Sequence, residues 1–486
     1  MRGVVESGDF LFRLYGSRRQ DGYLNRERRV GPHMKYSQTV RCRNATHVAG
    51  SLFVFFLLGN ICLRTVHSEN WPAWRGAHGL GVSHEKALPT SWGPEDNVRW
   101  RVPLPEPGNS TPIVWGDRIF VTQALAEKHR RQLMCFSRRN GKVLWSKGIT
   151  HTGKEVTHGS NYFCSTSPVT DGKHVIAWFG SAGVHCYDLQ GKHLWSRNLG
   201  TQNHDWGYAA SPVIHGELCV INFGPGEREF LVALNKRTGE TVWQVDALRP
   251  ADETALVVSG TDGDAPADDA QFDPARRSKS LRGSWSTPLL IRTESRDELI
   301  VSHPRRVTAY DPSTGNELWT CRGLGPLIYS SPIWDKGVLI SMGGYFGGSL
   351  AVRPGGRGDV TSSHRLWHKL RSPLWLGCGV VHGGYIYVHN MRSVVQCMEL
   401  VTGEVRWEER QAGTEGSNDT WSSLLLCNET IYHINQTGDT FVFRASPEYK
   451  LMSVNSLKER TNSSIAASNG ELFIRTHENL WCISLK

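Results

Sequence analysis

Two segments of the chain concentrate polar side chains that could perform chemistry. The first carries His151, His158 and Asn161, and the second carries His204 and Asp205. A metal ion needs three or four converging ligands, and a sequence does not show convergence. We predict no metal site. The pattern leaves two alternatives open: a metal bound by His151, His158 and His204, and a hydrolase or lyase that uses the same histidines with Asp205.

These segments are also rich in aromatic residues, which recur in similar positions further along the chain. Several of them stand a few residues before a Ser-Pro or Thr-Pro pair. Apolar walls with a few polar groups are typical of a ligand pocket, and the alternative is that the aromatic residues pack neighbouring sheets together. The candidate ligand-binding residues are His158, Asn161, Tyr162, His204, Asp205, Trp206, Trp285, Tyr329, Trp375 and Trp421.

The cysteines follow a pattern of packing rather than of chemistry. Nine of the eleven come after residue 68, no Cys-x-x-C pattern occurs, and no two cysteines are adjacent. Cys135, Cys186, Cys397 and Cys482 occupy the same place in a repeated strand, where other copies have alanine. A position that accepts Cys or Ala is a small packing position.

The elements that position these residues form a repeated unit of four short strands, which is clearest between Ser167 and Trp195. Its inner strands are apolar on both faces, so each sheet must lie between neighbouring sheets. A Ser/Thr-Pro pair opens five of the units, and most units close with a glycine followed four residues later by tryptophan. The closing tryptophans are Trp145, Trp195, Trp243, Trp319 and Trp407, and Trp367 takes this place after a longer turn.

Seven full units follow one another, and the end of the chain supplies only three strands between Ser464 and Leu485. One isolated strand, Val98 to Leu104, precedes the first unit and resembles a fourth strand. Together these four strands complete a last sheet and close a ring without free edges. The sequence therefore predicts an all-β, eight-bladed β-propeller of four-stranded antiparallel blades over residues 97–486. A seven-bladed ring is the alternative, because the last units are degenerate.

The basic charge lies in the leader. Residues 1–68 hold 11 Lys/Arg and 4 Asp/Glu of the totals 55 and 46, which leaves 44 against 42 for the remainder. We therefore expect no nucleic-acid partner. Residues 1–33 are interpreted as an over-extended start or a disordered leader, 34–68 as a signal peptide with an apolar run at 48–63, 69–96 as a lead segment, and 248–280 as a loop insertion. An uncleaved N-terminal anchor is the alternative.

Three stretches carry a resemblance to a known family: Ser167 to Gly172, Leu231 to Trp243 and Val307 to Trp319. They resemble the quinoprotein-type, or PQQ-like, β-propeller repeat. Its superfamily contains PQQ-dependent alcohol and sugar dehydrogenases and the non-enzymatic outer-membrane assembly factor B. The opening Trp71 to Gly76 and the closing Asn479 to Ile483 look like those of exported bacterial propellers.

The resemblance implies two different functions. Many enzymes of the superfamily hold PQQ in the central funnel between a tryptophan and a disulfide of adjacent cysteines, with calcium on Glu, Asn and Asp. This sequence has no adjacent cysteines and no recognisable calcium set. We therefore predict an exported, monomeric, non-catalytic binding or scaffold propeller without a cofactor. Its partner is an envelope protein or glycan, and it touches the membrane only through an uncleaved leader. The alternative is a PQQ- and calcium-dependent oxidoreductase with an atypical site.

Overall fold

The computed structural model describes residues 69–247, 282–344, 347–371, 373, 375–414 and 419–485. The predicted leader segments, 1–33 and 34–68, and the predicted insertion at 248–280 lie outside these residues. Across the described part of the chain, no helix is long and apolar enough to cross a membrane.

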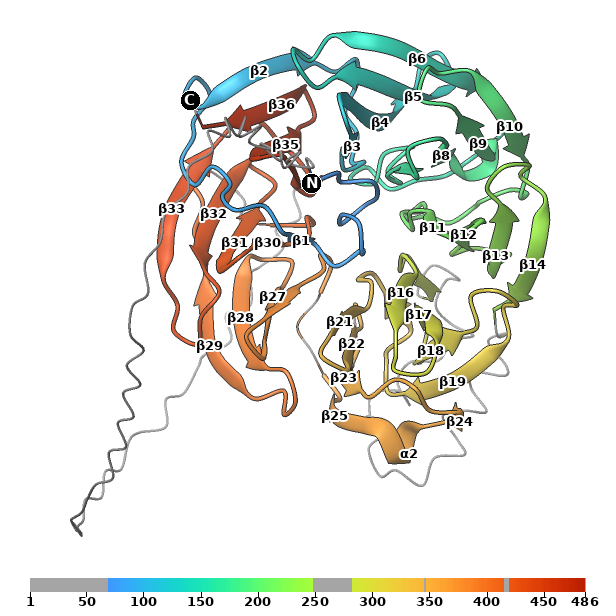
Figure 1. Cartoon of the computed structure of the whole chain (residues 1–486), viewed down its shortest axis with the longest axis vertical. Coiled ribbons are helices and arrows are strands. Elements are labelled where there is room, and N and C mark those ends of the chain that lie inside the picture. Colours follow the sequence, from blue (N-terminus) through green and yellow to red (C-terminus); the bar gives the residue numbers. More distant parts are fainter. Residues whose placement is uncertain are drawn as a thin grey trace, which may run out of the picture. The chain divides into compact units, whose positions relative to one another are not determined.

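The described residues form the expected all-β, eight-bladed propeller, whose blades follow one another around a ring (Figure 1). Blade 1 consists of β3 (Ile113–Trp115), β4 (Arg118–Leu125), β5 (Arg130–Ser137) and β6 (Val143–Thr150), and blade 2 of β7 (Val169–Thr170), β8 (Val175–Trp178), β9 (Val184–Tyr187) and β10 (His193–Arg197). Blade 3 consists of β11 (Val213–His215), β12 (Leu218–Phe223), β13 (Phe230–Asn235) and β14 (Thr241–Asp246), and blade 4 of β16 (Leu289–Arg292), β17 (Asp297–His303), β18 (Arg306–Tyr310) and β19 (Glu317–Arg322). Blade 5 consists of β21 (Ile333–Asp335), β22 (Val338–Met342), β23 (Ser349–Val352) and β25 (Arg365–Lys369), and blade 6 of β26 (Val380–His382), β27 (Tyr385–His389), β28 (Val394–Glu399) and β29 (Val405–Arg410). Blade 7 consists of β30 (Leu425–Cys427), β31 (Thr430–Ile434), β32 (Asp439–Arg444) and β33 (Leu451–Ser456), and blade 8 of β34 (Ala466–Ser468), β35 (Glu471–Arg475), β36 (Asn479–Ser484) and β2 (Val98–Pro103).

Blade 8 closes the ring in the predicted way. Strand β2 from the start of the propeller pairs antiparallel with β36 from its end, so that Trp100 faces Cys482 (Figure 1). Because both ends of the ring share one sheet, closure links the two ends of the propeller. The remaining elements are small additions: β1 (Val82–Ser83), β15 (Gly283–Ser284), a 3-10 helix (Gly180–Ala182), β20 (Leu327–Ile328), β24 (Gly358–Asp359) and α2 (Thr361–His364).

Each repeated tryptophan lies on the fourth strand of its blade and faces a small residue in the third strand. The pairs are Trp145 with Cys135, Trp195 with Cys186, Trp243 with Ala233, Trp319 with Ala309, Trp367 with Ala351, Trp407 with Cys397 and Trp100 with Cys482. This arrangement confirms that the Cys/Ala position is a packing position, since a larger residue there would compete with the indole for space.

The same tryptophans also join one blade to the next. The indole N–H of Trp195 in blade 2 donates to the Lys236 carbonyl of blade 3 at 2.9 Å. The Gly239 backbone packs on the Trp195 ring, so that a Cβ at Gly239 would lie 2.5 Å from it. Glycine and tryptophan therefore recur at a fixed spacing because the glycine of each blade packs on the preceding blade and the tryptophan bonds to the following one. Equivalent indole bonds into the next blade are made by Trp100, Trp145, Trp243, Trp367 and Trp407.

Trp319 is the exception among the closing tryptophans. Its indole N–H donates to the buried Glu298 carboxylate of its own blade at 2.8 Å. Blade 5 carries β24 and α2 before its outer strand, and β24 pairs in parallel with β19 of blade 4. The insertion therefore replaces the indole contact at this junction with a strand contact.

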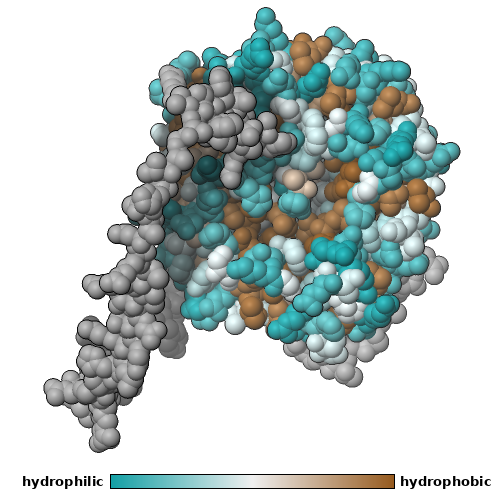
Figure 2. Space-filling view, in the orientation of Figure 1, coloured by the Kyte–Doolittle hydropathy of each residue, from teal (hydrophilic) through white to brown (hydrophobic). Residues whose placement is uncertain are grey.

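On the face of the propeller shown in Figure 2, hydrophobic residues gather towards the middle and hydrophilic residues make up most of the rim. The inner strands are buried on both faces, as in β8 and β9, whereas β10 buries only Trp195. The core thus lies between adjacent blades, as the apolar inner strands predict.

Two glycine substitutions test the contact between blades. Gly239 and Gly216 both have positive φ, of +74° and +54°, but a Cβ at Gly216 would meet no atom within 4 Å. We expect Gly216→Ala to cost about 1 kcal/mol through backbone strain alone. Gly239→Ala should cost about 1 to 3 kcal/mol more, because the added methyl collides with Trp195. Denaturant unfolding of both variants measures the difference, and equal losses would contradict the docking role of Gly239.

Candidate functional site

A closed ring of hydrogen bonds surrounds the axis where the inner strands begin. One residue of each blade accepts a bond from the backbone N–H of its counterpart in the preceding blade, at 2.8 to 3.2 Å. These residues are at most 7% exposed. The ring residues are Thr111, Ser167, Ser211, Thr287, Ser331, Cys378, Ser423 and Ser464, and Ser464 donates back to Thr111.

The N-terminal lead fills the channel at the other end of the inner strands. Trp71 exchanges two backbone hydrogen bonds with Val114, and the Pro72 carbonyl accepts from Thr170. Further along the lead, the Gly81 carbonyl accepts from Leu426. Val114, Thr170 and Leu426 lie on the innermost strands of blades 1, 2 and 7, each three residues after the ring residue of its blade. The lead therefore closes one end of the channel and leaves a cup.

Arg75 holds the N-terminal lead in place through side-chain hydrogen bonds. Its buried guanidinium donates to the carbonyl of Gly379, which follows the ring residue Cys378, and to the carbonyls of Gly79 and Leu80. Burial lowers the pKa of Arg75, and the nearby Cys378 thiol acts in the opposite direction. The side chain therefore ties the fold of the lead to blade 6.

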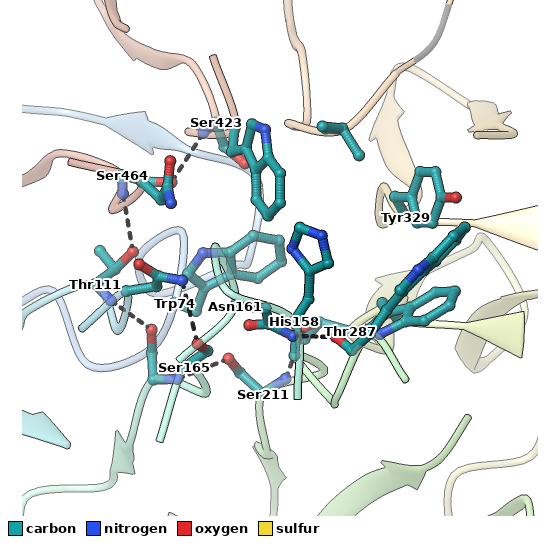
Figure 3. A pocket seen from close by; sticks show the side chains of 18 of the residues that line it. Trp74, Thr111, His158, Asn161, Ser165, Ser211, Thr287, Tyr329, Ser423 and Ser464 are labelled. Carbon is teal, nitrogen blue, oxygen red and sulfur yellow. Dashed lines mark hydrogen bonds between the residues drawn. The ribbon is translucent and has the colours of Figure 1, made fainter. Parts of the chain in front are cut away.

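The cup holds a cavity of about 290 Å³, a volume at the lower end of the range of small-molecule sites. Six ring residues line it together with Trp74 of the lead, and Figure 3 shows their hydrogen bonds beside the Trp74 side chain. The other lining residues are Asn109, His158, Asn161, Ser165, Trp206, Ala209, Trp285, Tyr329, Leu376, Met391, Trp421 and Asn462.

Three aromatic rings form one continuous wall of this cup. The ring centroids of Trp206 and Trp285 lie 5.8 Å apart, and Tyr329 lies 6.0 Å from Trp206 and 5.2 Å from Trp285. The three residues come from the connections between blades 2 and 3, 3 and 4, and 4 and 5. Trp285 is fixed by a 2.9 Å bond from its indole N–H to the Gly207 carbonyl.

The segment 151–164 reaches over the mouth of the cup. The Ser160 carbonyl accepts hydrogen bonds from Asn109 and Asn462, at 2.8 and 3.1 Å. The imidazole of His158 stacks on Trp421, with centroids 6.4 Å apart, although the two residues come from the connections that follow blades 1 and 6. Asn161 donates to the Trp206 carbonyl at 2.7 Å. This segment therefore connects opposite sides of the mouth.

Six of the ten predicted residues line the cavity: His158, Asn161, Trp206, Trp285, Tyr329 and Trp421. The other four do not. The Tyr162 ring packs edge-on against His477, Asp205 is exposed, and Trp375 is buried in the core between blades 5 and 6. His204 lies behind the wall, edge-on to Trp285 at 5.1 Å, and burial lowers its pKa.

Sequence reasoning missed the residues that come from the lead and from the last blade. Trp74 lies in the distinctive Trp-Pro-Ala-Trp-Arg-Gly stretch, which was the only signal for it. The Ser/Thr-Pro pairs marked five members of the hydroxyl ring, but Cys378, Ser423 and Ser464 have no following proline. Asn109 and Asn462 belong to no repeated sequence pattern that could have predicted their place in the cavity.

The lining residues do not fit PQQ with calcium. No aspartate, glutamate, lysine or arginine is among the described residues that line the cavity. PQQ carries several carboxylates, and a buried anion requires a compensating charge, whereas calcium requires oxygen ligands that usually include carboxylates. Throughout the described ranges, no group of three or more His, Cys, Asp or Glu side chains is placed to hold a metal.

Burial raises the pKa of eight of the nine cysteines in the described residues. The nine cysteines in the described residues are buried and form no disulfide. Burial raises the pKa of Cys135, Cys164, Cys219 and Cys321 to about 12. Because the thiolate is the nucleophile, these side chains are inert at neutral pH.

Comparison with known proteins agrees with this fold. The repeats and the ring of blades define a PQQ-like repeat propeller, and the described lining of its cup contains no Asp, Glu, Lys or Arg. The chain belongs to the family described as "Outer membrane protein assembly factor BamB", whose profile matches residues 90–226 and 227–486.

Solved structures share the fold at low sequence identity. BamB from Moraxella catarrhalis is 14% identical with a TM-score of 0.54, over 79% of this chain and 96% of that one. The quinohemoprotein alcohol dehydrogenase of Comamonas testosteroni is 10% identical with a TM-score of 0.59, over 85% and 80%. The corresponding enzyme ADHIIG of Pseudomonas putida HK5 is 10% identical with a TM-score of 0.56, over 86% and 81%. No curated protein matches the chain.

A stacked pair of histidines supports the segment that carries Trp421. His389 and His433 are fully buried with centroids 4.3 Å apart. The Nε2 atom of His389 lies 2.8 Å from the Ser422 carbonyl, and that of His433 lies 3.1 Å from the Thr420 hydroxyl. Burial lowers the pKa of His389 to about 4, and burial together with the His389 charge holds the pKa of His433 well below its usual range.

This pair predicts a loss of stability in mild acid. The unfolded state binds protons below the ordinary histidine pKa of about 6.5, whereas the folded pair resists them down to about pH 4, so the free energy of unfolding falls as pH falls through this window. Each histidine contributes up to about 1.4 kcal/mol per pH unit. Urea unfolding at pH 7.5 and pH 5 measures the slope, which should be smaller in His433→Gln and unchanged in the exposed His84→Gln. If His433→Gln left the slope unchanged, the histidine pair would not be the cause of the loss of stability in acid.

Proposed function

We propose that this chain is an exported, non-catalytic binding propeller whose cup holds a small, uncharged ligand. The observation that carries the proposal is the lining of the cup: an aromatic wall, a ring of buried hydroxyls and no Asp, Glu, Lys or Arg among the described lining residues. Such a site supplies apolar contact and orientation, and its described lining holds a single imidazole, that of His158, with no carboxylate to orient it or to hold a metal.

The proposed location outside the cytoplasm has two supports. One is the signal-like leader in residues 34–68. The other is the matched family, which is described as an outer membrane protein assembly factor. That description also supports a scaffold role, in which the blade connections around the mouth contact an envelope protein or glycan while the cup holds its ligand.

A thermal-shift screen of charged and uncharged small molecules tests the cup directly. We expect uncharged compounds to raise the melting temperature of the wild-type protein but not that of Trp206→Ala/Trp421→Ala. Both tryptophans are only partly buried, so the double variant should remain folded. Trp334→Ala, on the side of the ring where the lead lies, is the matched control and should respond like the wild type. Stabilisation that survives the double variant would contradict binding in the cup.

The oxidoreductase alternative predicts a different result. Protein incubated with PQQ and calcium, and then assayed with alcohols, sugars and an electron-accepting dye, should show no dye reduction above the protein-free control. Tight PQQ binding with dye reduction would overturn the proposal of a non-catalytic propeller.

A further inference from the structure

The ring hydroxyls have hydrogen-bonding capacity that the protein leaves unused. A serine or threonine hydroxyl has one donor hydrogen as well as two acceptor lone pairs. The seven hydroxyls of the ring accept backbone N–H bonds, but within the described residues none of them donates to a protein atom. Because buried polar groups are nearly always paired, the six ring hydroxyls that line the cavity form a wall of donors for whatever occupies the cup.

The ring hydroxyls also keep acceptor capacity. Each has two lone pairs and accepts one backbone N–H bond, so a second lone pair is left for the occupant of the cup. Across the cavity, the rings of Trp206, Trp285 and Tyr329 form a continuous apolar wall. The occupant should therefore have oxygen atoms that both accept and donate, together with an apolar face.

Charge narrows the choice of ligand further. An anion would enter a site without a described cationic side chain in its lining, at a high desolvation cost. A cation would find no carboxylate among the described lining residues, so cation–π attraction to the aromatic rings alone would have to offset the cost of burying its charge. A neutral quinone has an apolar face and acceptor oxygens, but it has no donor for the second lone pairs of the ring hydroxyls. A neutral saccharide has hydroxyls that donate and accept, and a face of C–H groups that stacks on aromatic rings.

The geometry points to a neutral saccharide unit as the ligand of the cup, bound with its oxygens towards the hydroxyl ring and its C–H face on the wall of Trp206, Trp285 and Tyr329. This assignment rests on the proposed function, because it names the chemical class of the uncharged ligand. The sugar is held by hydrogen bonds and stacking alone, and no bond in it is broken.

Isothermal titration with four probes tests the assignment in the full chain. N,N'-diacetylchitobiose and cellobiose are neutral disaccharides, and menadione is a neutral quinone. Chitobiose is the same sugar as the first with two amines in place of the acetamides, and the titrations are run at a pH below the pKa of these amines so that both are ammonium groups. We expect at least one neutral disaccharide to bind, and chitobiose to bind at least 10-fold more weakly than its acetylated form.

Serine-to-cysteine variants test the ring itself. Cys378 shows that a thiol is accepted in this ring, where it receives the Ser331 N–H bond. Ser211→Cys keeps that acceptor role but replaces a strong donor by a weak one, and it should weaken sugar binding about 3- to 10-fold. The matched control is Ser331→Cys, which makes the same change at a ring position that does not line the cavity and should leave affinity unchanged. Ser423→Cys on the opposite side of the ring serves if Ser211→Cys does not fold.

The outcomes separate the two proposals. Binding of menadione without any sugar would overturn the saccharide assignment and leave the proposed function standing. Sugar binding that is unchanged in both Ser211→Cys and Ser423→Cys would overturn the role of the ring. If no probe binds, the saccharide assignment is wrong, and the thermal-shift screen with the tryptophan double variant decides the proposed function separately.

Discussion

Eight backbone N–H groups around one axis must find partners where the inner strands begin, and the structure solves this by letting each blade supply an acceptor to the blade before it. The ring from Thr111 to Ser464 closes on itself, so every blade is fixed against two neighbours at the axis. Tryptophans at the periphery add a second link at most junctions between blades, through bonds such as that of Trp195 to the Lys236 carbonyl. Buried N–H groups tolerate no missing partner, so the closed ring and these links hold neighbouring blades together.

The cup is a consequence of the same ring. Short polar side chains at the axis leave space where longer ones would fill it, and the lead closes the other end through Trp71, Pro72 and Gly81. Connections between blades are free of the packing constraints on the strands, so they carry the aromatic wall and the segment with His158. The aromatic wall and the segment over the mouth therefore come from the connections between blades, whose sequences the hydrogen-bonded ring does not constrain.

The sequence predicted the propeller because its constraints repeat. Gly239 and Trp195 occur at fixed spacing, since each contacts the neighbouring blade in the same way. The site was predictable only in part. Trp285 and Trp375 occupy similar sequence positions, but Trp285 faces the cavity whereas Trp375 packs between blades. Trp74 and the bond from Arg75 to Gly379 depend on a contact across about 300 residues, which no local pattern encodes.

If the hydroxyl ring gives its unused donors to an uncharged ligand in the cup, a crystal structure of the protein soaked with N,N'-diacetylchitobiose will show the contacts. Sugar oxygens should lie within hydrogen-bond distance of the Ser167, Ser211 or Ser464 hydroxyls, and a sugar face should lie on the wall of Trp206, Trp285 and Tyr329. An unoccupied cup at saturating sugar, with the ring hydroxyls donating to protein atoms instead, would contradict this role of the ring.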